Sequence, residues 1–152
     1  PMGATGQPLA PDVGTLPVSS RHVRVAVVGA HLRGMPLNFQ LTTRRAVFVE
    51  ATHTAPRYRL YALANTQPQK PGIARATSGA AIEVELWDIP LARFGEFVAE
   101  IPAPLGIGSL ELSDGRWVKG FICEPAALND ATDITEFKGW RHWIARKENH
   151  HV

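Results

Sequence analysis

The chain has 152 residues, of which 45% are hydrophobic and 20% charged, and its 16 Lys and Arg against 14 Asp and Glu give a formal net charge of +2. This length suits one domain that buries a core without disulfide or metal staples, which excludes a multidomain enzyme. The composition excludes a disordered, collagenous or coiled-coil chain, and the small net charge argues against a nucleic-acid partner.

The charges are unevenly distributed along the chain. Residues 21–75 carry nine basic side chains against the single acid Glu50, whereas residues 76–136 carry eleven acids against three bases. Two interpretations stay open. The two segments pair with each other across one fold, or the basic segment recognises an anion, a role for which the Arg fork is suited because it contacts carboxylates in a bidentate way.

One cysteine cannot form an internal disulfide, so we expect a reducing compartment and a cytoplasmic location. This residue, Cys123, lies in an apolar run, where a buried inert thiol is expected rather than a nucleophile. No apolar run approaches the roughly 20 residues of a membrane span, and no membrane association is expected.

The first part of the chain predicts a linker, a strand and a loop. Residues 1–20 hold four of the twelve prolines without strand or helix periodicity and are expected to form a linker or N-terminal extension. Residues 22–29 are rich in Val and predict a buried strand. A small-residue loop follows over 29–38, and residues 39–45 are expected to begin a short helix.

The middle of the chain predicts further strands and a helix. Proline and glycine delimit strands expected at residues 46–52, 58–63 and 73–75. Residues 81–88 alternate between apolar and other side chains, which is typical of a strand with two distinct faces. Apolar spacings of three and four predict an amphipathic helix over residues 91–101.

The last part of the chain predicts a hairpin over residues 108–123, with Ser113-Asp-Gly115 as its turn, and a final helix over 139–147. Residues 148–152 are expected to form a disordered tail. Together these elements indicate an α+β fold, a small mixed β-barrel with a few short helices. A doubly wound parallel sheet is disfavoured because the chain lacks regular helical crossovers.

The loop after the first strand is the leading candidate site. Gly29, Ala30 and Gly34 leave backbone N–H groups accessible, so the loop either holds a carboxylate or phosphate or is only a tight turn. His31 lies in its middle, and an imidazole with an ordinary pKa of about 6.5 donates a proton near neutral pH. The alternative is a loop histidine that is merely solvated or hydrogen-bonded.

Other charged residues leave two interpretations open. Arg75 either clamps an anion together with Arg33 and Arg59 or forms a structural ion pair with Glu83 or Glu85. If the strand face that carries Glu83 and Glu85 lies inside the fold, burial raises the carboxyl pKa and supplies a second acid or base. The sequence has no serine-hydrolase elbow and no metal-ligand spacing, so no metal or other cofactor is expected.

Several segments resemble the C-terminal domain of allophanate hydrolase, over nearly all of residues 22–144. The resemblance rests on Val28-Gly-Ala-His-Leu-Arg-Gly-Met-Pro-Leu-Asn38, Tyr58-Arg-Leu-Tyr-Ala-Leu63, Lys70-Pro-Gly72, Ile82-Glu-Val-Glu-Leu-Trp87, Ile101-Pro-Ala-Pro-Leu-Gly-Ile-Gly108, Asp114-Gly-Arg-Trp-Val-Lys-Gly-Phe121, Cys123-Glu124, Asp133-Ile-Thr135 and Gly139-Trp-Arg141. It implies that residues 21–147 form such a domain, with a gamma-glutamyl cyclotransferase-like fold in which the loop after the first strand cradles the substrate.

The resemblance also implies a function in urea degradation. It implies that in the full enzyme an N-terminal amidase deaminates allophanate and the C-terminal domain decarboxylates the product, N-carboxycarbamate, to carbon dioxide and ammonia. The expected partners are this small dicarboxylate and an amidase domain, covalently joined or docked, with a homodimer as a further possibility.

We expect His31 to act as the general acid that protonates the carbamate nitrogen. The residues expected to bind or orient the substrate are Gly29, Ala30, Leu32, Asn38, Tyr58, Arg75 and Glu83. Among them, Arg75 and the loop N–H groups would anchor the dianion, and Glu83 would tune the pKa of His31.

Two other functions remain as alternatives. One is a non-catalytic assembly or dimerisation domain for the amidase. The other is cyclotransferase activity, which is disfavoured because the Tyr-Gly-Ser-Leu loop of cyclotransferases is replaced here and their base glutamate has no clear counterpart, Glu96 lying at an offset position.

Overall fold

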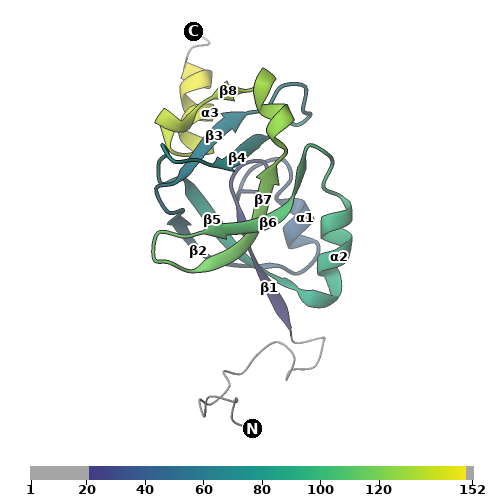
Figure 1. Ribbon diagram of the computed structural model, residues 1–152. Coiled ribbons are helices and arrows are strands. Elements are labelled where there is room, and N and C mark those ends of the chain that lie inside the picture. The colour runs from purple at the N-terminus through teal and green to yellow at the C-terminus, as the bar shows by residue number, and fades with distance from the viewer. Residues whose placement is uncertain (1–20, 150–152) are drawn as a thin grey trace, which may run out of the picture.

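The computed structural model describes residues 21–149, and its centre is a five-stranded sheet (Figure 1). In spatial order the strands are β2 (Val47–His53), β5 (Glu83–Pro90), β1 (His22–Val27), β7 (Trp117–Cys123) and β6 (Leu105–Glu111). Strand β1 pairs antiparallel with β5 on one side and parallel with β7 on the other. Val25, Ala26 and Val27 are fully buried, because the Val-rich run lies in the middle of the sheet.

A second sheet lies at the end of the molecule away from the start of β1 (Figure 1). Its strands, in spatial order, are β4 (Pro71–Arg75), β3 (Tyr58–Ala62) and β8 (Thr132–Asp133). Strand β4 contacts β7 of the first sheet, so the two sheets share one core. The α+β prediction with mixed sheets and short helices is confirmed, although the strands form two separate sheets rather than one closed barrel.

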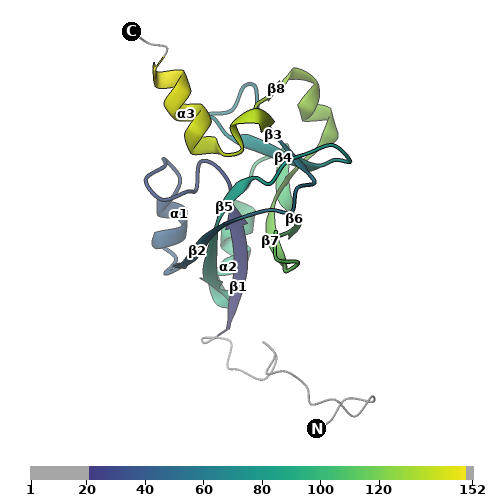
Figure 2. The same cartoon turned by 90° about the vertical axis from the view of Figure 1, so that its left-hand side faces the viewer.

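Three short α-helices surround the sheets: α1 (Phe39–Thr42), α2 (Leu91–Ala99) and α3 (Trp140–Asn149). Helix α2 follows Pro90 directly and buries Phe97 completely against the first sheet. Helix α3 lies at the end of the molecule that carries the second sheet (Figure 2). Two 3₁₀ helices, Pro125–Asp130 and Thr135–Phe137, flank β8, and neither they nor β8 were expected from the sequence.

The hairpin β6–β7 and the helices α1, α2 and α3 are observed where they were predicted, with boundaries that differ by up to three residues. The predicted linker, residues 1–20, and the last three residues of the predicted tail, 150–152, lie outside the described residues. Helix α3 extends to Asn149, two residues past the expected end. Within residues 21–149, no helix has both the length and the apolar composition that crossing a bilayer requires.

The basic and acidic segments pair with each other across the fold. The pairs that join a base of residues 21–75 to an acid of residues 76–136 are Arg24–Asp88, Arg33–Glu85, Arg44–Glu96, Arg44–Glu100, Arg57–Glu111, Arg59–Asp133 and Arg75–Glu111. The first of the two interpretations is therefore correct for these arginines. These arginines form structural ion pairs within the fold.

Candidate functional site

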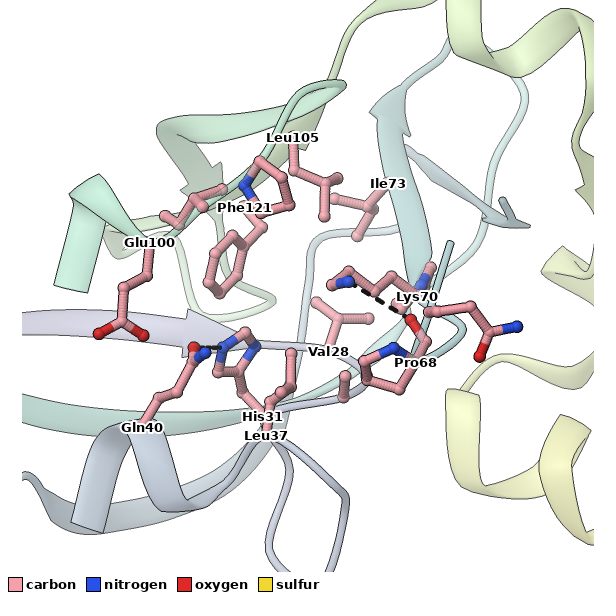
Figure 3. A pocket seen from close by; sticks show the side chains of 16 residues that line it. Val28, His31, Leu37, Gln40, Pro68, Lys70, Ile73, Glu100, Leu105 and Phe121 are labelled. Atoms are coloured by element: carbon pink, nitrogen blue, oxygen red, sulfur yellow. Dashed lines mark hydrogen bonds between the residues drawn. The ribbon is translucent and has the colours of Figure 1, made fainter. Parts of the chain in front are cut away.

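A cavity of about 190 Å³ lies beside the loop that follows β1 (Figure 3). Its polar side chains come from the loop, α1, the segment before β4 and the end of α2, and they are His31, Gln40, Gln67, Lys70 and Glu100. Most of the remaining wall is apolar and includes Val28, Leu37, Ile73, Leu105 and Phe121. A few polar groups set in an apolar wall are typical of a small-molecule site.

The loop is folded onto itself and onto β4. The N–H of Leu32 donates to the carbonyl of Gly29 at 3.0 Å, and the N–H of Leu37 donates to the carbonyl of Ala30 at 2.8 Å. A Cβ atom added to Gly29 would overlap the ring of Pro71, so only glycine allows this approach. No acceptor among the described residues takes the N–H of Ala30 or of His31.

His31 is held on several sides and is only 8% exposed. Its ring stacks on Phe121 with centroids 5.0 Å apart and meets the edge of Phe97 at 5.5 Å. Its Nε2 lies 2.7 Å from Oε1 of Gln40, and the side chain of Asn38 donates to its backbone carbonyl at 2.8 Å. The opposite edge of the imidazole, which carries Nδ1, lies on the side of Pro68 and Lys70 (Figure 3).

Burial lowers the pKa of His31 below its ordinary value of 6.5. The hydrogen bond to Gln40 and the charge of Glu100 oppose this effect, whereas the charge of Lys70 adds to it. His31 on its own is therefore mostly neutral at pH 7. A bound anion would favour the imidazolium form.

Lys70 is the buried cation of the cavity, with 7% exposure. Its Nζ donates to the carbonyl of Pro68 at 3.3 Å, and no carboxylate within residues 21–149 lies close enough to form an ion pair with it. An ammonium group has three donors, so two remain for a ligand. With no counter-ion among residues 21–149, this buried ammonium is a candidate group for binding an anion.

Glu100, at the C-terminal end of α2, is the carboxylate of the cavity wall. The guanidinium of Arg44 donates to it and, through Nε, also to Glu96 at 3.1 Å. Arg44 is itself buried, so the charge of Glu100 is largely balanced. Glu96, which the sequence offered at an offset position, is bound to Arg44 and Arg93 and does not line the cavity.

The structure brings together only part of the residue set expected from the sequence. Gly29, Ala30 and His31 line the cavity. Asn38 does not line it, but its side chain donates to the backbone carbonyl of His31. Leu32 does not line the cavity, because its side chain is buried in the core.

Tyr58, Arg75 and Glu83 are not among the residues that line the cavity. The hydroxyl of Tyr58 accepts the backbone N–H of Glu111 at 2.9 Å, and Arg75 donates to the carboxylate of Glu111 at 3.0 Å. Glu83 pairs with Nε2 of His142 at 2.6 Å. The structure places each of these side chains in a structural contact away from His31.

Glu85 shows how an ion pair reverses the expected effect of burial. Burial alone would raise the pKa of this carboxyl, but the backbone N–H of Arg33 and the side chains of Arg141, Arg33 and Trp87 donate to it and hold the pKa below its ordinary value. The expectation of a raised pKa on this strand face is therefore wrong for Glu85. The carboxylate fixes the loop at Arg33 to helix α3 at Arg141.

Among the cavity residues that sequence reasoning missed are Gln40, Lys70, Glu100 and Phe121. Each comes from a different part of the chain, and no spacing connects them with His31. The sequence distinguishes Lys70 from the other bases of residues 21–75 in one respect, because it is the single lysine among nine basic residues.

Cys123 is half-buried, and burial raises the pKa of its thiol. Its Sγ lies 3.4 Å from the carbonyl of Glu124. The thiol is therefore not activated, as expected from the apolar sequence around it.

Comparisons with known proteins identify the family. The sequence profile of the allophanate hydrolase C-terminal domain matches residues 23–145. A urea amidolyase from Lachancea kluyveri is 44% identical over 127 residues, which are 80% of this chain and 7% of that protein.

Solved structures agree with this assignment. The allophanate hydrolase of Kluyveromyces lactis superposes with a TM-score of 0.80 at 42% identity, over 90% of this chain and 22% of that one. A protein specific to uropathogenic E. coli superposes with a TM-score of 0.76 at 32% identity, over 82% of this chain and 96% of that one. This chain therefore spans a small part of the length of its amidolyase relative and nearly the full length of the bacterial protein.

Proposed function

The chain belongs to the family of the allophanate hydrolase C-terminal domain, and on that premise we propose that it decarboxylates N-carboxycarbamate, the product of the amidase step in allophanate degradation. The observation that carries this proposal is the meeting of His31 and Lys70 in one cavity. One group supplies a proton and the other binds an anion, and both are buried.

The proposed substrate is a dianion with a carboxylate at each end. Lys70 binds one carboxylate, and the N–H groups of Ala30 and His31, for which the described residues supply no acceptor, bind the other. Lys70 takes the anchoring role that the sequence analysis gave to Arg75. Asn38 keeps the loop in place through its bond to the carbonyl of His31.

The reaction breaks the bond between nitrogen and one carboxyl carbon. The electron pair of this bond stays on nitrogen, which takes a proton from the imidazolium of His31, and the products are carbon dioxide and carbamate. Carbamate then takes up a second proton and divides into carbon dioxide and ammonia. Each turnover thus consumes two protons and needs no metal or other cofactor.

The lowered pKa of His31 fits this role. Burial and Lys70 make its imidazolium a stronger acid than a solvent-exposed one, and a bound dianion supplies the negative charge that allows this imidazolium to form. His31 is therefore expected to gain its proton when the substrate enters and to lose it to nitrogen.

The proposal is tested by adding the chain to an amidase domain that lacks its own C-terminal domain and following carbon dioxide release from allophanate. The wild-type chain should accelerate release, and His31→Ala should reduce the acceleration at least about 100-fold, the usual contribution of a general acid. His53→Ala, which removes an exposed histidine away from the cavity, should match the wild type. Equal acceleration by the wild type and His31→Ala, or none by either, would overturn the proposal.

An assembly role for the amidase is the second candidate function. Phe39 and Val47 are large apolar side chains that are more than half exposed. If this role is the main one, the chain should bind the amidase domain or itself in sedimentation experiments without changing carbon dioxide release. We also keep a homodimer and a cytoplasmic location as proposals.

A further inference from the structure

We propose that Gln40 is a positioning residue that fixes the imidazole of His31 as the tautomer protonated at Nε2, with Nδ1 as the atom that exchanges its proton with the ligand. The effect of this tautomer on catalysis rests on the proposed function. The tautomer itself is a property of the protein alone and is measured without substrate.

The main chain of Gln40 is fixed on both sides. Its N–H donates to the carbonyl of Leu37 at 3.0 Å, and its carbonyl accepts Nη1 of Arg44 at 2.8 Å. Arg44 is buried and bound to Glu96 and Glu100 as well, so it holds α1 against α2. The side chain of Gln40 therefore reaches His31 from a rigid base.

The aromatic neighbours of His31 fix the plane of its ring, but they do not determine which edge of the ring faces Gln40. Phe121 stacks on the imidazole with an interplanar angle of 17°, and Phe97 contacts it edge-on. A half-turn of the ring about its bond to Cβ would preserve both contacts. The bond between Nε2 and Gln40 is the interaction that distinguishes the two directions.

Figure 3 shows the result of this arrangement. Gln40 and Glu100 lie on one side of the imidazole, and the edge that carries Nδ1 lies on the side of Lys70. With Oε1 of Gln40 accepting Nε2–H, the neutral ring presents an unprotonated Nδ1 toward the anion-binding side. A proton taken up at Nδ1 is then the one delivered to the substrate nitrogen.

A neutral amide suits this task better than a carboxylate. A carboxylate at 2.7 Å would hold the imidazolium and raise its pKa, whereas an amide orients Nε2–H without adding charge. The other charged groups near His31 are Lys70 and Glu100, and Arg44 balances Glu100. The protonation of His31 is thus left to respond to the ligand.

The test is ¹⁵N NMR of the imidazole of His31 in the wild type and in Gln40→Met, Gln40→Glu and Gln67→Met. In the wild type above pH 8, we expect the shifts of a neutral ring protonated at Nε2. Gln40→Met should give averaged shifts of mixed tautomers, and Gln40→Glu should raise the pKa of His31 by about one unit or more. Gln67→Met, a change to a glutamine of the same wall that does not contact His31, should keep the wild-type tautomer.

Kinetics separates positioning from a structural role. Gln40→Met should lower kcat for decarboxylation about tenfold and change KM less than threefold, and Gln40→Glu should move the pH optimum upward. A wild-type ring protonated at Nδ1, or an unchanged tautomer in Gln40→Met, would overturn the inference. A wild-type chain with the expected tautomer but no decarboxylation would instead overturn the proposed function.

Discussion

Gly29 and Pro71 touch so closely that the loop carrying His31 and the first residue of β4 leave no room for a side chain between them. Both residues line the cavity, so this contact sets the distance between the loop and the segment that carries Lys70. The glycine of the Gly-Ala-His-Leu loop is thus required by packing.

Gly29→Ala should therefore lower the free energy of unfolding by about 1–3 kcal/mol, because the rigid Pro71 ring cannot move aside for a methyl group. The variant should also lose binding of dicarboxylates. Gly95→Ala is the matched control, since a Cβ in this position of α2 meets no atom within 4 Å and alanine favours a helix by about 1 kcal/mol. Chemical denaturation measures both variants, and equal effects would contradict the packing argument.

Glu85→Gln should destabilise the fold by about 2 kcal/mol at pH 7, because Arg33 and Arg141 lose a shared buried carboxylate. The pKa of this carboxyl is lowered by folding, so its contribution is present above the unfolded pKa of about 4.5 and is lost as the pH falls through the folded pKa. In urea titrations below pH 4.5, the difference in free energy of unfolding between Glu85→Gln and the wild type should therefore become smaller.

Glu83→Gln serves as the control for Glu85. Its partner His142 is exposed, and an exposed pair contributes about 0–1 kcal/mol. If Glu83→Gln lowered the free energy of unfolding as much as Glu85→Gln, burial of the carboxylate would not explain the stability that Glu85 contributes.

Lys70→Met should weaken malonate binding about 10-fold to 100-fold, the effect of losing a hydrogen bond to a charged group. The fold should keep or gain stability, since the buried ammonium has no counter-ion among residues 21–149. Calorimetry and thermal unfolding separate the two effects. A variant that binds malonate as the wild type does would remove Lys70 from the site.

The stability of the wild type should depend on pH through His31. Folding lowers the pKa of this group, so its contribution is fully present above the unfolded pKa of about 6.5 and is lost as the pH falls toward the folded pKa. In urea titrations from pH 8 to pH 5, His31→Gln should lose less stability than the wild type, by up to about 1.4 kcal/mol per pH unit. If the free energy of unfolding depended on pH in the same way in both proteins, His31 would not be buried as a neutral imidazole.

The elements with strong local signals were predictable from the sequence. The turn Ser113-Asp-Gly115 predicts the β6–β7 hairpin, and the Val-rich run predicts β1 as a buried strand. The division into two sheets was not predictable, because the parallel pairing of β1 with β7 joins segments about ninety residues apart and depends on packing rather than on local pattern.

Only the part of the candidate site whose residues are neighbours in the sequence was predictable. The loop and His31 are neighbours in sequence, and the expected loop does line the cavity. The charge of the segment pointed to Arg75 as the anchoring cation, whereas in the structure Arg75 pairs with Glu111, and we propose Lys70 for this role. Which basic side chain of residues 21–75 lies buried in the cavity wall is decided by tertiary packing, and Lys70 is identified only from the fold.

The decisive measurement is the titration of His31 by NMR, without and with saturating malonate, because malonate carries the two carboxylates of N-carboxycarbamate on an inert carbon. If His31 is the proton donor, malonate should raise the pKa of His31, and the Kd of malonate should be lower at pH 6 than at pH 8, since binding takes up a proton. Malonate that binds without shifting the titration of His31, or a chain that does not bind malonate at either pH, would contradict this role of His31.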